Sequence, residues 1–212
     1  LTVENGNVSL NQTLGLIFDD GCDCDGLEDS SISFTANPQN FNNAISSLSF
    51  HPLNDYYGPD AEINIIVNDQ GNIGIPDGSD PSELINSLVI SISVNAINDP
   101  PIITIPTAMV VDEDSEILIL EFFVDDVDIA DYTMEVELST ENGVMTFSEL
   151  GGIDFDYGDG LEDEQVSFSG TLLNVNNLLS SITFIPNENF NGNVSFSVDV
   201  NDLGAYGSGG SL

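Results

Sequence analysis

The sequence predicts an all-β protein built from β-sandwiches, because apolar residues recur at every second position and because one long stretch of the chain occurs twice. Residues 88–94 read Leu-Val-Ile-Ser-Ile-Ser-Val, and residues 194–200 read Val-Ser-Phe-Ser-Val-Asp-Val. Successive side chains of a strand point to opposite faces, so each segment would have one apolar and one largely polar face. This pattern is typical of antiparallel sheets that pack one face on a core and leave the other in water.

The expected strands are short, and Gly, Pro, Asn and Asp residues separate them. Short strands with frequent turn signals favour a sandwich over other all-β arrangements. No long segment shows the period of an α-helix, and only residues 174–179 are expected to form a short helical turn.

The duplicated stretch covers most of the chain at a nearly constant spacing. The offset is 137 positions for the first matched pair of segments, 134 for the two central pairs and 133 for the last pair. The turn between the first two pairs therefore carries about three extra residues in the first copy. The matched pairs are 4–6 with 141–143, 26–29 with 160–163, 42–52 with 176–186, and 67–71 with 200–204.

These matches divide the chain into a first repeat at residues 1–98 and a second repeat at residues 99–212. Residues 101–137 have no counterpart in the first repeat, which is expected to lack its opening strands. Residues 84–94 have no counterpart in the second repeat, which is expected to lack its closing strand. Two interpretations stay open: the chain is a piece of a longer tandem array, or neighbouring copies complete each other's sandwiches by sharing strands and so form a filament.

The charge of the chain restricts its partners. It has 37 Asp and Glu residues, no Lys or Arg and one His, which gives a formal net charge of -37. Self-repulsion of this size destabilises a compact state unless solvent cations offset it, either at specific divalent sites or through adaptation to high salt. The same charge excludes nucleic acid as a partner, since phosphate binding needs Lys and Arg. No apolar run approaches the roughly 20 residues of a membrane-spanning helix, so we expect no membrane insertion.

Several motifs resemble parts of tandem cadherin-like repeats, and their order along the chain matches as well. Residues 94–101 (Val-Asn-Ala-Ile-Asn-Asp-Pro-Pro) resemble the linker between such repeats, and residues 111–115 (Val-Asp-Glu-Asp-Ser) resemble the acidic motif after the first strand. Residues 125–128 resemble the Asp-x-Asp loop, and residues 67–71 the end of the penultimate strand. The duplicated Asn-Asn segment is similar to the middle of repeats in very large bacterial surface proteins and adhesins.

The resemblance implies tandem Greek-key sandwiches of the cadherin/immunoglobulin-like kind, an extracellular or cell-surface location, and calcium at the junction between repeats. Neighbouring copies or adjacent repeats would then be the partners, with a cell-surface glycan or protein as a further candidate. The linker departs from the fuller cadherin pattern at Ala96 and Pro100, which favours one ion over three.

Acidic and amide side chains gather in predicted turns, where they could supply the roughly six to eight oxygen ligands that calcium takes. The alternative is that these acidic turns are simply solvated. Glu113 would serve a junction at the opposite pole, Asp69 is the first-repeat counterpart of Asp202, and Asp55 lies near the expected place of a further cadherin motif. The residues expected at the junction are Asn98, Asp99, Asp126, Asp128 and Asp202.

No pattern indicates an enzyme: there is no phosphate-binding glycine loop and no nucleophile elbow, and the one histidine, His51, has Ile185 at the matching position. We expect a structural or adhesive repeat module, with a glycan-binding sandwich as the alternative function. Glycan binding usually needs exposed aromatic platforms, and the chain has no Trp.

Two smaller features complete the expectations. Glycosylation sequons begin at Asn7, Asn11 and Asn193, as a secreted glycoprotein could use them. Cys22 and Cys24 are the only cysteines, and they could be free thiols, a strained or inter-chain disulfide, or metal ligands.

Overall fold

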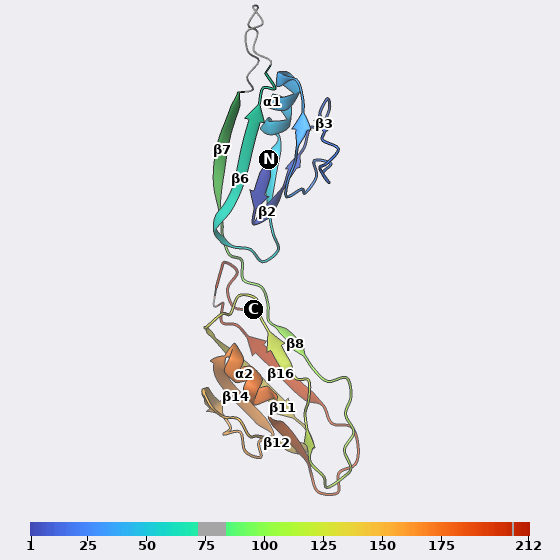
Figure 1. Ribbon diagram of the computed structural model, residues 1–212. Helices are drawn as coiled ribbons and strands as arrows, with labels where there is room; N and C mark the ends of the chain where they lie inside the picture. The colour runs from blue at the N-terminus through green and yellow to red at the C-terminus, as the bar shows by residue number, and fades with distance from the viewer. Residues whose placement is uncertain (72–83, 205) are drawn as a thin grey trace, which may run out of the picture. The chain divides into compact units, whose positions relative to one another are not determined.

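The computed structural model describes residues 1–71, 84–204 and 206–212. The chain forms two compact units, Leu1–Ala96 and Ile97–Leu212. The boundary lies two residues before the one placed at 98/99 from the repeats. Both units consist mainly of antiparallel strands with one short helix each, so the all-β class is confirmed (Figure 1).

The first unit contains three small antiparallel sheets in its described residues. One has the strand order β1-β6-β7, the second pairs β2 with β5, and the third pairs β3 with β4. The elements are β1 (Thr2–Glu4), β2 (Gly6–Leu10), β3 (Ile17–Phe18), β4 (Phe34–Thr35), α1 (Pro38–Ser46), β5 (Leu48–Pro52), β6 (Gly58–Asn68) and β7 (Ile85–Val94).

The second unit contains a larger sheet with the strand order β13-β14-β11-β16. A second sheet has the order β12-β15-β9, and β10 pairs with β8. The elements are β8 (Ile102–Thr104), β9 (Ile117–Leu118), β10 (Phe123–Asp125), β11 (Thr133–Thr140), β12 (Gly143–Phe147), β13 (Ile153–Tyr157), β14 (Gln165–Thr171), α2 (Leu172–Leu179), β15 (Ile182–Pro186) and β16 (Phe196–Asn201).

The helices were the least predictable elements. The helical turn expected at 174–179 is part of α2, but α1 was not expected, because its Asn-rich sequence has low intrinsic helix propensity. Each helix begins with a side-chain cap: Asn37 accepts a hydrogen bond from the Asn40 N–H, and Thr171 accepts one from the Asn174 N–H. Such caps satisfy backbone donors that have no partner inside the helix.

The two units repeat the same local hydrogen bonds. The Val8 N–H donates to the Asp29 carbonyl, and the Met145 N–H donates to the Asp163 carbonyl in the same way. Within each acidic turn the Asp carboxylate of the Gly-Leu-Glu-Asp segment accepts the N–H of the glycine three residues earlier. The duplicated segments of the sequence thus form duplicated turns.

The cores of the two units differ in size. In the second unit, both main sheets and α2 bury apolar side chains that include Phe147, Phe168 and Leu178. In the first unit the fully buried set is smaller and centres on Val8, Leu10 and Ile32.

Candidate metal centre

The residues expected at the calcium junction all belong to the second unit, and the structure brings them together at one end of it. Asn98 and Asp99 directly follow Ile97, the first residue of the unit; Asp126 and Asp128 follow β10, and Asp202 follows β16. Asn98 and Asp128 are each 5% exposed and Asp202 is 1% exposed, which is unusual burial for side chains of these types.

Asp126 organises the loop that follows β10. Its Oδ1 accepts hydrogen bonds from the N–H groups of Asp128, at 2.8 Å, and Ile129, at 3.0 Å. The carboxylate of Asp128 in turn accepts the Asp99 N–H at 2.7 Å, which ties the loop to the first residues of the unit. The second carboxylate oxygen of Asp126, Oδ2, is buried and has no hydrogen-bond partner among the described residues.

Asp202 joins the turn after β16 to the start of the unit. Its Oδ1 accepts the N–H groups of Gly204 and Leu212, both at 2.9 Å, and its Oδ2 accepts a hydrogen bond from the Asn98 side-chain amide. The same amide nitrogen donates to the Gly210 carbonyl at 3.1 Å. The amide oxygen of Asn98, Oδ1, is buried and without a partner in the part of the chain that the structure describes.

The acids of this loop are buried without a positively charged side chain beside them, since the chain contains no Lys or Arg. Burial raises the pKa of Asp126, and the neighbouring charges of Asp202 and Asp128 raise it further, against the lowering effect of its two backbone hydrogen bonds. Burial alone would also raise the pKa of Asp202, but the N–H groups of Gly204 and Leu212 and the Asn98 amide together hold that pKa below its ordinary value. Asp202 therefore stays ionised while the Asp126 carboxylate is electrostatically penalised.

This arrangement offers oxygen donors to a hard cation. Two buried oxygens, one amide and one carboxylate, lack partners, and buried polar atoms without partners are rare in folded proteins. Calcium coordinates carboxylate and amide oxygens, so the donor chemistry fits that ion. Among the described residues, no three His, Cys, Asp or Glu side chains are already gathered as a metal-binding group, so the donor set depends on the Asn98 amide as well as on carboxylates.

The other expected ligands lie elsewhere. Asp69 belongs to the first unit, where its Oδ1 accepts the N–H groups of Gly71 and Leu84, both at 2.9 Å. These backbone hydrogen bonds, that from Leu84 most strongly, lower the pKa of Asp69. Asp55, also in the first unit, and Glu113, in the second, are exposed.

One contact near Glu113 was missed from the sequence. The carboxylate of Asp114 accepts the Asn189 N–H at 2.7 Å, and Asn189 occupies the position that matches Asp55 of the first repeat. Both Asp114 and Asn189 have positive φ angles, of 60° and 57°. The acidic run at 111–115 was the available signal, but it did not indicate which acid would bind the distant turn.

The remaining residues are placed as follows. Cys22 and Cys24 form a disulfide with their Cα atoms 5.2 Å apart. Of the three sequon residues, Asn11 and Asn193 are exposed and Asn7 is half-buried on β2. The Asn11 amide also donates a hydrogen bond to the Ser47 carbonyl at 2.7 Å.

Comparisons with known proteins identify no relative: no family model, no curated protein and no solved structure matches the chain. No helix in the described residues has the length and apolar character needed to cross a membrane.

Proposed function

We propose that the second unit binds one calcium ion among Asn98, Asp99, Asp126, Asp128 and Asp202, and that the chain is an extracellular structural or adhesive module of tandem Greek-key, cadherin-like repeats. The observation that supports this best is the pair of partnerless oxygens, Asn98 Oδ1 and Asp126 Oδ2, buried beside two acids in a chain without basic side chains. A cation bound near both oxygens would satisfy them and would also offset the local negative charge.

The hydrogen bonds around these oxygens explain what calcium would stabilise. They connect three segments that are distant in sequence: the start of the unit, the loop after β10 and the turn after β16. An ion bound there holds the first residues of the unit, which directly follow the connection at Ala96, to the end of the sandwich. The ion would thereby stiffen the junction between repeats, which suits a protein that spans distance.

Calorimetric melting of the full chain tests the proposal. Melting is measured in EDTA and then with increasing CaCl2, at ionic strength held constant with NaCl. At calcium about 100-fold above its Kd we expect the transition of the second unit to rise by roughly 10–20 °C. Magnesium is the ionic control, since it demands a smaller octahedral site and should have less effect.

A variant identifies the ligand atoms. Asn98→Ala removes one partnerless oxygen and should reduce the calcium-dependent rise, whereas Asn177→Ala, on α2, should not. A melting temperature unchanged by calcium would contradict the proposal. A rise that NaCl alone reproduces would indicate general charge screening in place of a specific site.

A further inference from the structure

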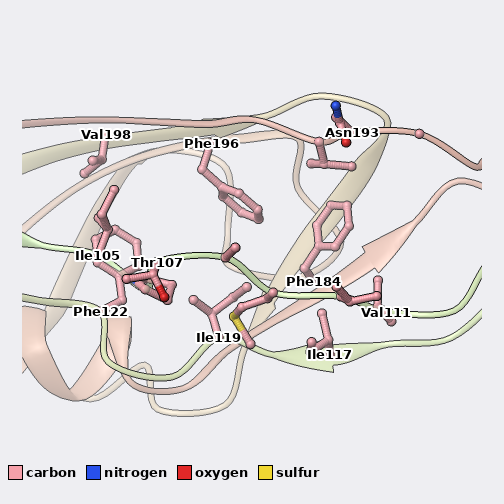
Figure 2. Close-up of a pocket in the computed structure, with 16 residues that line it drawn as sticks. Ile105, Thr107, Val111, Ile117, Ile119, Phe122, Phe184, Asn193, Phe196 and Val198 are labelled. Carbon is pink, nitrogen blue, oxygen red and sulfur yellow. The ribbon is translucent and has the colours of Figure 1, made fainter.

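The second unit has an apolar groove of about 590 Å³ beside β16. Figure 2 shows Phe196 and Val198 of β16 facing this groove, opposite the segment that carries Ile105 and Thr107, with Phe122 near its floor. Phe184 of β15 and Ile119 also line it. The groove is thus lined by β16, the last strand of its sheet, and by residues of the sheet that contains β15 and β9.

In the part of the chain that the structure describes, one edge of β16 is free, whereas the equivalent edge of its counterpart in the first unit, β6, is occupied by β7. β16 pairs with β11 alone among the described residues, while its counterpart β6 pairs with β1 on one side and β7 on the other. The turns that follow β6 and β16 also show that these strands are counterparts. The Gly71 N–H donates to Asp69 Oδ1 after β6, and the Gly204 N–H donates to Asp202 Oδ1 after β16.

The β6–β7 register shows what a β7-type strand would bring to the groove. Ile63 of β6 lies opposite Ile90 of β7, and Ile65 lies opposite Leu88. The positions that match Ile63 and Ile65 in the second repeat are Phe196 and Val198, the two β16 residues that face the groove. Directly opposed residues of an antiparallel pair share one face, so the apolar face of a β7-type strand would cover the groove.

β7 is available for such a contact. It is the end strand of its own sheet, and its apolar side chains are unusually exposed: Leu88 is 60% exposed and Ile90 38%. Folded proteins usually protect such edges with charged residues. β7 carries no charged residue at all, although 17% of the chain is charged.

The groove is equally free of charge. Residues 105–111, which form one wall, and β16 residues Phe196 and Val198 on the other wall include no acid. Two copies that each carry a net charge of -37 repel one another, so a contact between copies is favoured where neither surface carries acids.

From these observations we propose that the groove accepts β7 of a second copy of this chain, which adds as a strand to the free edge of β16. The contact joins different surfaces of the two copies, so it repeats head to tail and builds a linear assembly. This inference goes beyond the calcium site and does not depend on it.

Sedimentation velocity of the full chain tests the proposal, over a range of protein concentrations and in NaCl high enough to screen the repulsion. We expect concentration-dependent oligomers. Leu88→Asp on β7 and Thr107→Asp in the groove should each weaken association by about tenfold or more, because each places an acid in the contact. Leu173→Asp is the matched control: Leu173 is 70% exposed on α2, outside both surfaces, and its variant should associate like the parent chain.

A labelled synthetic peptide of residues 84–95 provides the second measurement. It should bind the chain, compete with self-association and bind the Thr107→Asp variant less well, while a scrambled peptide should do none of these. A chain that stays monomeric under all these conditions overturns the proposal. Peptide binding by a strictly monomeric chain also overturns it, because the groove would then take such a strand from a source other than a second copy.

Discussion

The two units share their local structure but not their degree of burial. Among the described residues, the core cluster of the second unit contains sixteen buried apolar residues, whereas that of the first unit contains six. Yet the acidic turns, the capped helices and the paired strands match residue by residue. The duplicated sequence is therefore sufficient for the local structure, and the core depends on what covers it.

The covering segment can be identified. In the second unit, the chain before β11 contributes Ile119, Phe122, Val124 and Ile129 to the core, and β9 pairs with β15. In the described part of the first unit, β5, the counterpart of β15, pairs with β2 alone. Ile63 and Ile65 of β6 are buried, but the β7 residues opposite them, Ile90 and Leu88, remain partly exposed. Burial of apolar area is the main stabilising contribution to folding, so the second unit should be the more stable of the two.

Removing one aromatic side chain from each core should have the largest effect. Phe168 is fully buried and packs on Phe155, with ring centroids 5.7 Å apart; its counterpart Phe34 is half-buried and packs on Phe18 at 6.2 Å. We expect Phe168→Ala to lower the free energy of unfolding of its unit by about 3–5 kcal/mol. Phe34→Ala should lower that of the first unit by about half as much, since less area is uncovered.

Urea unfolding followed by amide hydrogen exchange would assign each loss to its unit. Equal losses for the two variants would show that the first unit is as well packed as the second, which would contradict the proposed difference in burial.

A second pair of variants compares the two matching turns. The expected loss is about 2–3 kcal/mol of the stabilisation that the second unit gains at saturating calcium. Asp202 is buried against Asn98, whereas Asp69 makes the same backbone hydrogen bonds at a more exposed position. Asp202→Asn should abolish most of the calcium-dependent stabilisation, because it removes a charge beside the partnerless oxygens.

Asp69→Asn is the control, since Asn can still accept both backbone hydrogen bonds. Its calcium response, measured by calorimetry, should equal that of the parent chain. Equal losses in both variants would indicate calcium sites in both turns.

The helix caps should show a smaller and more uniform effect. Asn37→Ala and Thr171→Ala each remove a side chain that accepts a hydrogen bond at a helix start, at a cost of about 1 kcal/mol. α1 buries only Ala44 while α2 buries Val175, Leu178 and Leu179, so α1 depends more on its cap. Hydrogen exchange of the helix amides should therefore accelerate more in Asn37→Ala; equal acceleration would show that packing holds the two helices alike.

The strands were predictable because alternation is a local signal. The alternating segments at 88–94 and 194–200 lie within or overlap β7 and β16. α1 was not predictable in this way, since it depends on the Asn37 cap and on Pro38 at its first turn in place of a strong helical pattern. The exposure of Leu88 and the burial of Phe168 were also not predictable. Alternation shows which face of a strand is apolar, but it does not show whether another segment covers that face.

The candidate metal centre was predicted from motif order. In the structure its five residues form two hydrogen-bonded groups that meet at the neighbouring residues Asn98 and Asp99: Asn98 with Asp202, and Asp99 with Asp128 and Asp126. Sequence could not distinguish Asp202 from Asp69, because both occupy the same turn and differ only in what packs against them. The contact between Asp114 and Asn189 was missed because it joins residues 75 positions apart, and no local pattern indicates such a contact. The pairing of Cys22 with Cys24 was one of several open alternatives.

The smallest predicted effect concerns pH in the absence of calcium, and it contrasts Asp126 with Asp69. The pKa of Asp126 is raised, so the folded second unit holds that proton more tightly than the unfolded chain does. Its contribution to stability is present at low pH and is lost as the pH rises through the raised pKa. The pKa of Asp69 is lowered, so its contribution is present at neutral pH and is lost as the pH falls through the lowered pKa.

Asp126→Asn removes the titrating group and keeps an oxygen that can accept the N–H groups of Asp128 and Ile129. In EDTA, the variant should therefore gain stability over the parent chain as the pH rises from about 4 to 7, as measured by urea unfolding of the second unit. Asp69→Asn should show the opposite trend in the first unit. With calcium at neutral pH, the parent chain should instead be more stable than Asp126→Asn. The ionised Asp126 carboxylate, which is unfavourable without a cation, is then a ligand of the ion. An Asp126→Asn variant that is less stable than the parent chain in EDTA at neutral pH would mean that the ionised carboxylate is satisfied without a cation.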